Sequence, residues 1–375
     1  MNGKGEEQNN YLPLMNGASQ SFWQASWRRL KKNKGAMAGL VMVVLAILIA
    51  VFGYFLAPDP SPFANRIILE IGGEKPGYSQ SFVLLKKDRT PTPGFFTRLV
   101  SGKLDEYEYM PITSWQVKGD SLIVQKFIDE GVTERMAFFK KQLALHPVIT
   151  KKYYLGTDKY GRDILSRLII GTRISLSVGL ITVLISLAVG ITFGAIAGYY
   201  RGLADNAIMW LINVIWSIPT LLLVFAITLL LGKGFWQVFI AVGLTMWVNV
   251  ARLVRGQVLA ARELQYVEAG KVLGFSDFRI IARHILPNIL GPILVIAASN
   301  FASAIVIEAG LSFLGVGVQP PQPSWGLMIK ENYNFIITQN PMLALAPGFA
   351  IMLLVLAFNL LGNGLRDALN VRGKI

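Results

Sequence analysis

AMAGLVMVVLAILIAVFGYFLA, residues 36–57, is an uninterrupted apolar run near the start of this chain. An α-helix needs about 20 apolar residues to cross a hydrocarbon core of roughly 30 Å. The whole chain of 375 residues is 53% hydrophobic and only 15% charged, whereas a soluble protein carries about 25% charged residues. These observations predict a polytopic membrane protein.

Five further apolar runs follow, at about 174–199, 206–231, 236–254, 289–312 and 343–363. Together with the first run they predict an all-α polytopic membrane fold with six transmembrane helices. The first run is not expected to be a cleaved signal peptide, because it is too long and is preceded by about 35 residues.

Basic residues predict the orientation of these spans. A dense cationic cluster precedes the first span, formed by Arg28, Arg29, Lys31, Lys32 and Lys34. Because Lys and Arg are enriched in cytoplasmic segments, we expect both termini and the basic loop at 255–288 to be cytoplasmic. The basic residues before the second span disagree with this orientation, and nearby Asp residues offset part of their charge. We interpret the net charge of +14 as the result of basic residues that anchor the cytoplasmic side of the spans. We therefore expect no nucleic-acid partner.

This orientation divides the chain into four parts. They are a cytoplasmic tail at 1–35, a first transmembrane helix at 36–57, an extracytoplasmic insertion module at 58–150, and a core with five transmembrane helices at 151–375. In the insertion, the stretches RIILEI (66–71), YEYMPITSWQV (107–117) and SLIVQKFI (121–128) have the composition of strands. We therefore predict a small external α+β or mostly β module. It could be a structural cap or a surface for an external partner, and both readings stay open.

Small and polar residues inside the spans indicate how the helices pack. Gly190, Gly194 and Gly198 repeat at four-residue spacing, which lets helices approach closely; packing within the same subunit is favoured. Glu308 is a carboxylate deep in an apolar run, so it should face a polar interior. It is a candidate for the transport path or, equally, for a structural hydrogen bond. Asn213, Asn249 and Asn300 are further candidates for interior polar positions.

Residues for catalysis or energy conversion are missing from the sequence. It has no GxxxxGK[ST] phosphate loop, no cysteine and only two histidines. We therefore expect no enzyme, no metal site and no cofactor on this chain. The protein is either a carrier that works alone or a subunit driven by a separate motor.

The polar segment YVEAGKVLGFSDFRIIARHILPN, residues 266–288, lies between two apolar runs. It predicts one helix over 265–273, stopped by a left-handed Gly274. A second helix, capped by Ser276, is expected to run until Pro287 breaks it. A short helix with a small-residue surface suits a groove on another protein. The alternative is an amphipathic helix resting on the membrane.

The triplet Glu268-Ala269-Gly270, with Gly274 and Leu286-Pro287, resembles the EAA signature of permease subunits of ATP-binding cassette importers. In that family this loop carries a coupling helix that seats in a cytoplasmic ATPase. The resemblance implies ATPase-coupling roles for Tyr266, Val267, Glu268, Ala269, Gly270, Lys271, Leu273 and Gly274, and supporting roles for Arg279, His284, Leu286 and Pro287. Gly270 departs from the usual alanine and His284 from the common isoleucine.

Three other segments are similar to one branch of that family, the dipeptide, oligopeptide and nickel importers. They are SWRRLKKNKGAMAGLVMV (26–43), LGTDKYGRDILSRLIIGTRISLSVG (155–179) and GLSFLGVGVQPPQPSWGLMI (310–329). The first is similar to the second of the two permease subunits. Within 155–179, we expect an external collar formed by Gly156, Asp158, Gly161, Arg162 and Asp163, with the aspartates capping helices or pairing with arginines. The collar either meets a binding protein or only orients the second span.

The resemblance implies a permease that forms a path for di- or oligopeptides in the plasma (inner) membrane of a prokaryote. Its implied partners are a second homologous permease subunit, two cytoplasmic ATPase subunits that hold ATP and Mg, an extracytoplasmic substrate-binding protein, and membrane lipid. An importer of nickel or another small solute is the alternative within the family. An ion-coupled carrier is the alternative outside it, and the sequence does not rank the pathway residues.

Overall fold

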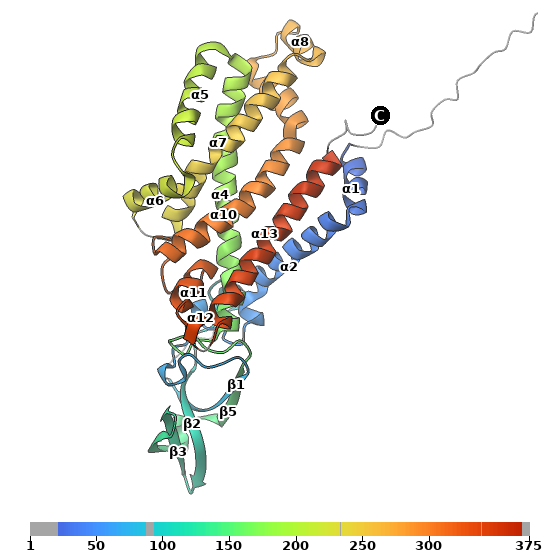
Figure 1. The fold of residues 1–375 in the computed structure, drawn as a ribbon. Helices are drawn as coiled ribbons and strands as arrows, with labels where there is room; N and C mark the ends of the chain where they lie inside the picture. The colour runs from blue at the N-terminus through green and yellow to red at the C-terminus, as the bar shows by residue number, and fades with distance from the viewer. Residues whose placement is uncertain (1–21, 88–93, 233, 339, 370–375) are drawn as a thin grey trace, which may run out of the picture.

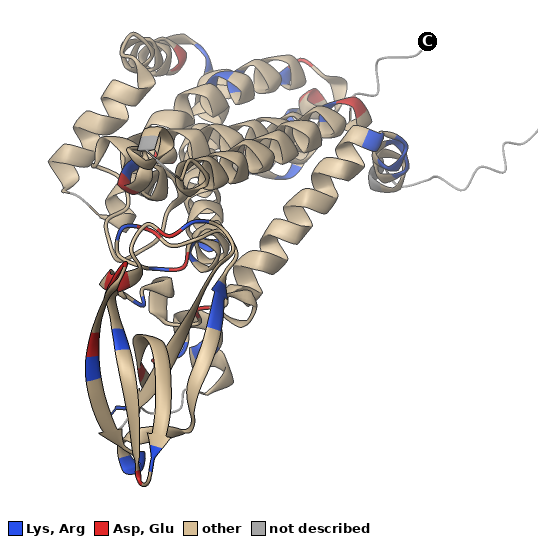
Figure 2. Cartoon of the chain, turned by 60° about the horizontal axis from the view of Figure 1, so that its bottom comes forward, with Lys and Arg blue, Asp and Glu red and all other residues tan. Residues whose placement is uncertain are grey.

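The computed structural model describes residues 22–87, 94–232, 234–338 and 340–369. The basic residues Arg372 and Lys374 and the first part of the N-terminal tail lie outside this range. A layer of long helices makes up most of the molecule, and Figure 1 shows a small β-sheet at one end of it and helix α8 at the opposite end. In Figure 2 the charged residues lie mainly near the helix ends and on the sheet, with long uncharged stretches of helix between them.

Within the part of the chain that the structure describes, five helical runs are long and apolar enough to cross a membrane. They are α2 (Lys34–Leu56), α4 (Ile164–Tyr200), α7 (Phe235–Arg262), the run Asp277–Leu314 that ends in α10 (Leu290–Leu314), and α13 (Met342–Leu369). The third span, expected at 206–231, is not one continuous helix. Helices α5 (Gly202–Trp216) and α6 (Thr220–Leu231) replace it, bent by 92° at a short break. Pro219, which lacks a backbone N–H and cannot continue a helix, lies in that break.

Counting the bent pair as one, the described residues contain six spans, and the mostly α-helical fold is as predicted. Helix α4 runs beside α7, and the glycine stripe lies at this contact. A Cβ added at Gly194 would lie 2.5 Å from the carbonyl oxygen of Ala251, and one at Gly198 would lie 2.8 Å from that of Arg255. The two helices are therefore in direct backbone contact within one chain.

The sheet is antiparallel, with strand order β4-β3-β2-β1-β5. Its strands are β1 (Tyr78–Lys86), β2 (Tyr107–Lys118), β3 (Ser121–Asp129), β4 (Val132–Phe139) and β5 (Leu143–Tyr153). Val83, Ile112 and Val124 form the centre of its small core. The short helix α3 (Phe95–Ser101) interrupts the connection from β1 to β2.

Two of the three predicted strands are confirmed, as β2 and β3. The third, at 66–71, was wrong: Leu69–Ile71 is a 3₁₀ turn. Its backbone bonds to the collar instead of to a strand, since the Ile68 N–H donates to the Tyr160 carbonyl at 3.0 Å.

The remaining helices are short and join the two ends to the layer. They are α1 (Phe22–Lys32), α8 (Gln265–Val272), α9 (Asp277–Arg279), α11 (Trp325–Asn332) and α12 (Phe335–Thr338). Trp325 at the start of α11 is buried, and its indole N–H donates to the Leu168 carbonyl at 3.0 Å.

Candidate coupling surface and translocation site

Helix α8 is short because its sequence stops it at both ends. Gly274 has φ +73° and ends it, since a side chain is disfavoured in that conformation. The N–H of Gly274 donates to the Lys271 carbonyl at 2.9 Å and that of Phe275 to the Gly270 carbonyl at 3.0 Å. These bonds satisfy the last carbonyls of the helix.

One side of α8 is anchored in a core. Val267 and Gly270 are buried, and Val267 packs in a cluster with Ile280 and Ile285 from the following helical turns. A Cβ at Gly270 would meet Phe275 at 3.5 Å, which is an ordinary contact. The alanine that is usual at this family position would therefore fit here.

The other side of α8, the residue after it and the start of α9 project apolar groups from the molecule. Val272 is 88% exposed, Leu273 70% and Phe278 80%. Glu268, Ala269 and Lys271 are exposed beside them. Large apolar side chains gathered with charges on a protruding helix are typical of a protein contact surface.

From Gly274 the chain continues as one helical run into the layer. Ser276 Oγ accepts from the Arg279 N–H and caps α9; a π-helical turn over Ile280–Ile285 and a 3₁₀ turn over Leu286–Ile289 lead into α10. The expected break at Pro287 is absent. Pro287 lies at the start of the 3₁₀ turn, where a missing N–H is tolerated, and the run Asp277–Leu314 stays helical.

Three side chains that the sequence did not single out tie this loop to the layer: Tyr199, Asp277 and Arg262. The Tyr199 hydroxyl, at the end of α4, donates to Asp277 at 2.8 Å, and Arg262, at the end of α7, donates to the Tyr199 carbonyl. No spacing rule connects Tyr199 with Asp277 or Arg262, so one sequence gives no signal for these contacts. Within the loop, the predicted supporting residues His284 and Arg279 both pack on Phe275: the His284 and Phe275 ring centroids are 5.6 Å apart, and Arg279 lies 4.1 Å over the same ring.

A hollow of about 420 Å³ lies among α5, α6, α7, α10 and α13. Its lining is apolar, hydroxyl or amide, and the polar members are Thr220, Thr245, Asn249, Ser303 and Asn359. Of the four predicted interior polar residues, Asn249 lines this hollow. Asn213 is exposed and accepts from Arg252 at 3.1 Å, and Asn300 is buried within α10.

Glu308 is buried away from the lining of that hollow. It accepts a 2.6 Å hydrogen bond from the Ser312 hydroxyl. Ser312 Oγ in turn accepts from the Val318 N–H at 3.0 Å, and Ser324 Oγ lies 3.3 Å away. Glu308 thus belongs to a hydroxyl cluster that closes the turn between α10 and α11.

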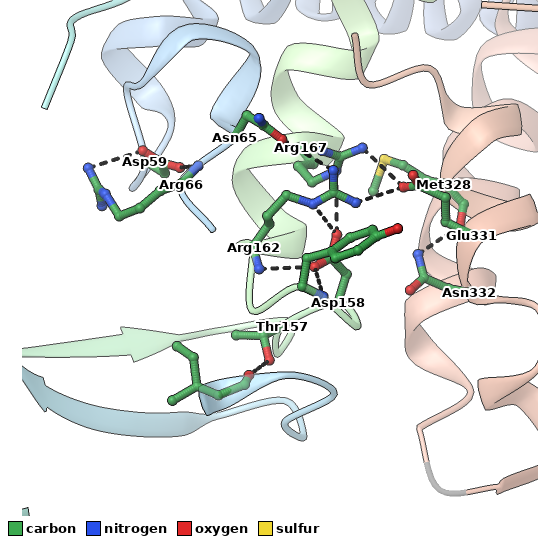
Figure 3. A network of polar contacts seen from close by, with 12 residues as sticks. Asp59, Asn65, Arg66, Thr157, Asp158, Arg162, Arg167, Met328, Glu331 and Asn332 are labelled. Carbon is green, nitrogen blue, oxygen red and sulfur yellow. Dashed lines mark hydrogen bonds and ion pairs between the residues drawn. The ribbon is translucent and has the colours of Figure 1, made fainter. Parts of the chain in front are cut away.

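The predicted collar is assembled at the sheet end of the helical layer, as Figure 3 shows. Asp158 accepts from Arg162 Nε at 2.6 Å, and Glu331 of α11 receives Arg162 at 2.8 Å and Arg167 at 3.3 Å. Asp163 caps α4 by accepting from the Ser166 N–H. All these charges are at least nine-tenths buried.

The two collar glycines are required by geometry. Gly156 and Gly161 have φ of +80° and +72°, and a Cβ at Gly161 would lie 1.7 Å from the Ile68 carbonyl oxygen. The collar therefore packs directly on the segment before the sheet. Among the described residues, no group of three or more His, Cys, Asp or Glu side chains is placed to hold a metal ion.

The sequence of this chain is similar to those of known membrane transport proteins. Residues 190–374 match the family described as binding-protein-dependent transport system inner membrane component, and residues 21–68 match the N-terminal TM domain of oligopeptide transport permease C. A dipeptide transport system permease protein of Bacillus subtilis is 32% identical over 365 residues, covering 97% of this chain and 90% of that protein. The chain belongs to this permease family.

Two other similar proteins differ in what their names say they transport. A glutathione transport system permease protein of Pectobacterium atrosepticum is 44% identical over 222 residues, which cover 59% of this chain and 73% of that protein. The solved MetNI methionine ABC transporter, in an inward-facing conformation, is similar over 55% of this chain and 96% of that chain, at 18% identity and a TM-score of 0.45.

Family membership confirms the resemblance seen in the sequence. This chain is an importer permease of the peptide branch of the ATP-binding cassette family, embedded in a membrane, and it is not itself an enzyme. The family implies ATPase subunits, a substrate-binding protein and a second permease as partners, and a bacterial inner membrane as location.

Proposed function

We propose that this chain forms part of a translocation path for di- or oligopeptides, and that α8 transmits motion from cytoplasmic ATPase subunits to that path. The observation that carries the proposal is the two-sided construction of α8. One side is fixed by Val267 and Gly270, while the other presents Val272 and Leu273 outward.

The connection after α8 supports a mechanical role. The helical run Asp277–Leu314 carries the chain from the coupling surface into the layer, and α10 contributes Ser303 and Ile307 to the hollow. A displacement of α8 would therefore move residues that line the path. Two packings of α10 against α7 and α13 would correspond to the two states of alternating access.

The lining of the hollow supports peptides over nickel as the solute. Amide and hydroxyl groups such as Asn249, Asn359 and Ser303 can donate to and accept from a peptide backbone. Ni²⁺ is bound by imidazole, thiolate or carboxylate groups in preference to these side chains. A mixed apolar and neutral polar wall suits peptides of varied side chains.

We place α8 and both termini in the cytoplasm and the sheet outside the inner membrane. The basic cluster in α1 and before α2 and the arginines at the ends of α7 and α9 support this orientation. The second permease subunit would complete the path on the side of α5 and α6, two ATPases holding ATP and Mg would receive the coupling surface, and a binding protein would deliver the solute to the sheet end.

We assign the collar a structural role within this plan. Its charged groups pair mainly with one another, with Arg162 placed between Asp158 and Glu331. Such a network holds α4, α11 and the sheet module together, and it leaves little charge free for a binding protein.

Charge reversal and backbone variants test the coupling role. In proteoliposomes with the partner subunits, Glu268→Lys and Gly274→Pro should abolish substrate-stimulated ATP hydrolysis while membrane insertion stays normal. Glu134→Lys, a matched reversal on the exposed strand β4, should leave stimulation unchanged. Normal stimulation in both α8 variants would refute the assignment.

A further inference from the structure

The short helix α3 carries an apolar side that the chain leaves uncovered. Its sequence is FFTRLVS, over Phe95–Ser101. At 100° per residue, Phe95, Phe96, Leu99 and Val100 fall on one side, and Thr97, Arg98 and Ser101 fall on the other. Phe96 is 78% exposed, and Phe95 and Val100 are exposed as well.

This helix is held rigidly although it lies in a connection between strands. Gly102, at φ +80°, follows it, and a Cβ there would lie 2.6 Å from the Pro60 carbonyl oxygen and 2.8 Å from the Tyr54 ring. From α4, Arg173 Nη1 donates to the carbonyls of Leu99 at 2.9 Å and Val100 at 3.1 Å. The exposed phenylalanines are therefore presented in a fixed position.

The place of α3 along the membrane normal follows from its neighbours. It packs on the last turn of α2: the Phe95 and Phe55 rings are 5.6 Å apart, and α2 ends at Leu56. On α4, Arg173 is the last basic residue before a long apolar stretch. Both neighbours place α3 where the hydrocarbon region ends.

The surface beside α3 is already lipid-facing. Along α2, apolar side chains such as Val51, Phe52 and Phe55 are exposed, as expected for a membrane span. The apolar side of α3 continues this surface. The Arg98 guanidinium also lies 4.6 Å over the Phe55 ring, which is a second contact between α3 and the last turn of α2.

We propose that α3 is a membrane anchor, whose side chains Phe96 and Val100 insert between the phospholipid headgroups of the leaflet at the sheet end. The connection from β1 to β2 thereby returns from the sheet to the bilayer and fixes the height of the sheet module above it. Aromatic residues favour this interfacial depth, and an amphipathic helix binds there through its apolar side. The inference depends on the membrane spans alone, and not on the solute or on coupling to ATPases.

Site-directed labelling can test this directly, because the sequence contains no cysteine. Single spin labels at Phe96→Cys and Val100→Cys would be compared with labels at Phe139→Cys and Val117→Cys. The control residues match in type, are similarly exposed, and lie at the end of the sheet that holds the β2–β3 turn. The full chain, purified with its partner subunits, would be placed in nanodiscs of phosphatidylcholine or phosphatidylglycerol.

The measurement is the collision rate of each label with oxygen, which concentrates in lipid, and with a water-soluble nickel chelate. We expect the oxygen-to-chelate ratio to be several-fold higher at 96 and 100 than at 139 and 117 in both lipids. Equal ratios at all four sites would place α3 in water. Protection of 96 and 100 from both reagents would mean that a protein surface covers them, and either result would overturn the proposal.

Discussion

Glu331 and Arg162 are 169 positions apart in the chain, and their side chains meet at 2.8 Å. This pair closes the collar, because it joins α11 to the turn that precedes α4. Arg167 reaches the same carboxylate at 3.3 Å, so one acid serves two buried guanidinium groups. The collar is thus a shared charge network in which each partner depends on the others.

Removing the Glu331 carboxylate should strongly lower the stability of the protein. Glu331→Gln would leave two buried arginines with less compensation, and breaking a buried pair costs about 3–5 kcal/mol. Thermal unfolding of the purified protein in detergent should show a large fall in Tm. The control is Glu263→Gln, which breaks the exposed pair with Arg201 and should cost less than about 1 kcal/mol. Similar Tm values for the two variants would contradict the network's importance.

The sequence predicted the collar contacts between residues close in the chain, but not the contacts with residues far away in the chain. Asp158 with Arg162, and Asp163 as a helix cap, are four or fewer positions from their partners, so spacing alone suggested them. Glu331 lies on another helix, and a single sequence carries no signal for such pairing. The same holds for Tyr199 and Asp277 at the coupling surface, which are 78 positions apart.

Hydropathy predicted the spans because it measures composition, and composition decides which residues can enter lipid. It did not predict the bend between α5 and α6, because composition does not encode the direction of a helix. Pro219 was visible in the sequence, but a proline inside a span can also be tolerated. Pro347, which lies inside α13 without ending it, shows that second outcome.

The contact between α4 and α7 gives a second prediction. Gly194→Ala would place a Cβ 2.5 Å from the Ala251 carbonyl oxygen, so the helices must separate, and overpacking of this kind costs about 1–3 kcal/mol. Gly256→Ala, in α7 itself, has nothing within 4 Å of the added atom. It should be neutral or slightly stabilising, because alanine is the better helix former. Both are measured as Tm in detergent, and an equal response would mean that close approach at Gly194 is unimportant.

The sheet module should respond to alkaline pH through Lys151. This side chain on β5 lies 4.4 Å over the Tyr109 ring. Burial, followed by the positive charge of Arg66, lowers the pKa of Lys151 from 10.5 to about 8. Between these two values the unfolded chain binds more protons than the folded one, so stability rises with pH. The destabilisation is complete below pH 8 and disappears as the pH approaches 10.5.

The check is to follow unfolding of the sheet by circular dichroism from pH 7 to pH 10. The wild type should gain stability relative to Lys151→Gln across this range. Tyr78, whose pKa is raised to about 12, is present in both proteins, so its titration does not contribute to the difference in stability between them. Lys152→Gln, on the neighbouring exposed position, is the matched control. A difference in stability between the wild type and Lys151→Gln that does not change with pH would show that Lys151 keeps its ordinary pKa in the folded protein.

The two glycines of the coupling loop should behave differently, although both belong to the family signature. Gly270→Ala adds a Cβ that meets Phe275 at an ordinary 3.5 Å, so the fold and stimulated ATP hydrolysis should be retained. Gly274→Ala meets no atom within 4 Å, but its φ of +73° costs an alanine roughly 1 kcal/mol or more. That cost should make the amides of 265–274 exchange with deuterium about fivefold faster, because the end of α8 opens more often. Equal exchange in the two variants would mean that the left-handed conformation at Gly274 does not hold α8 in place.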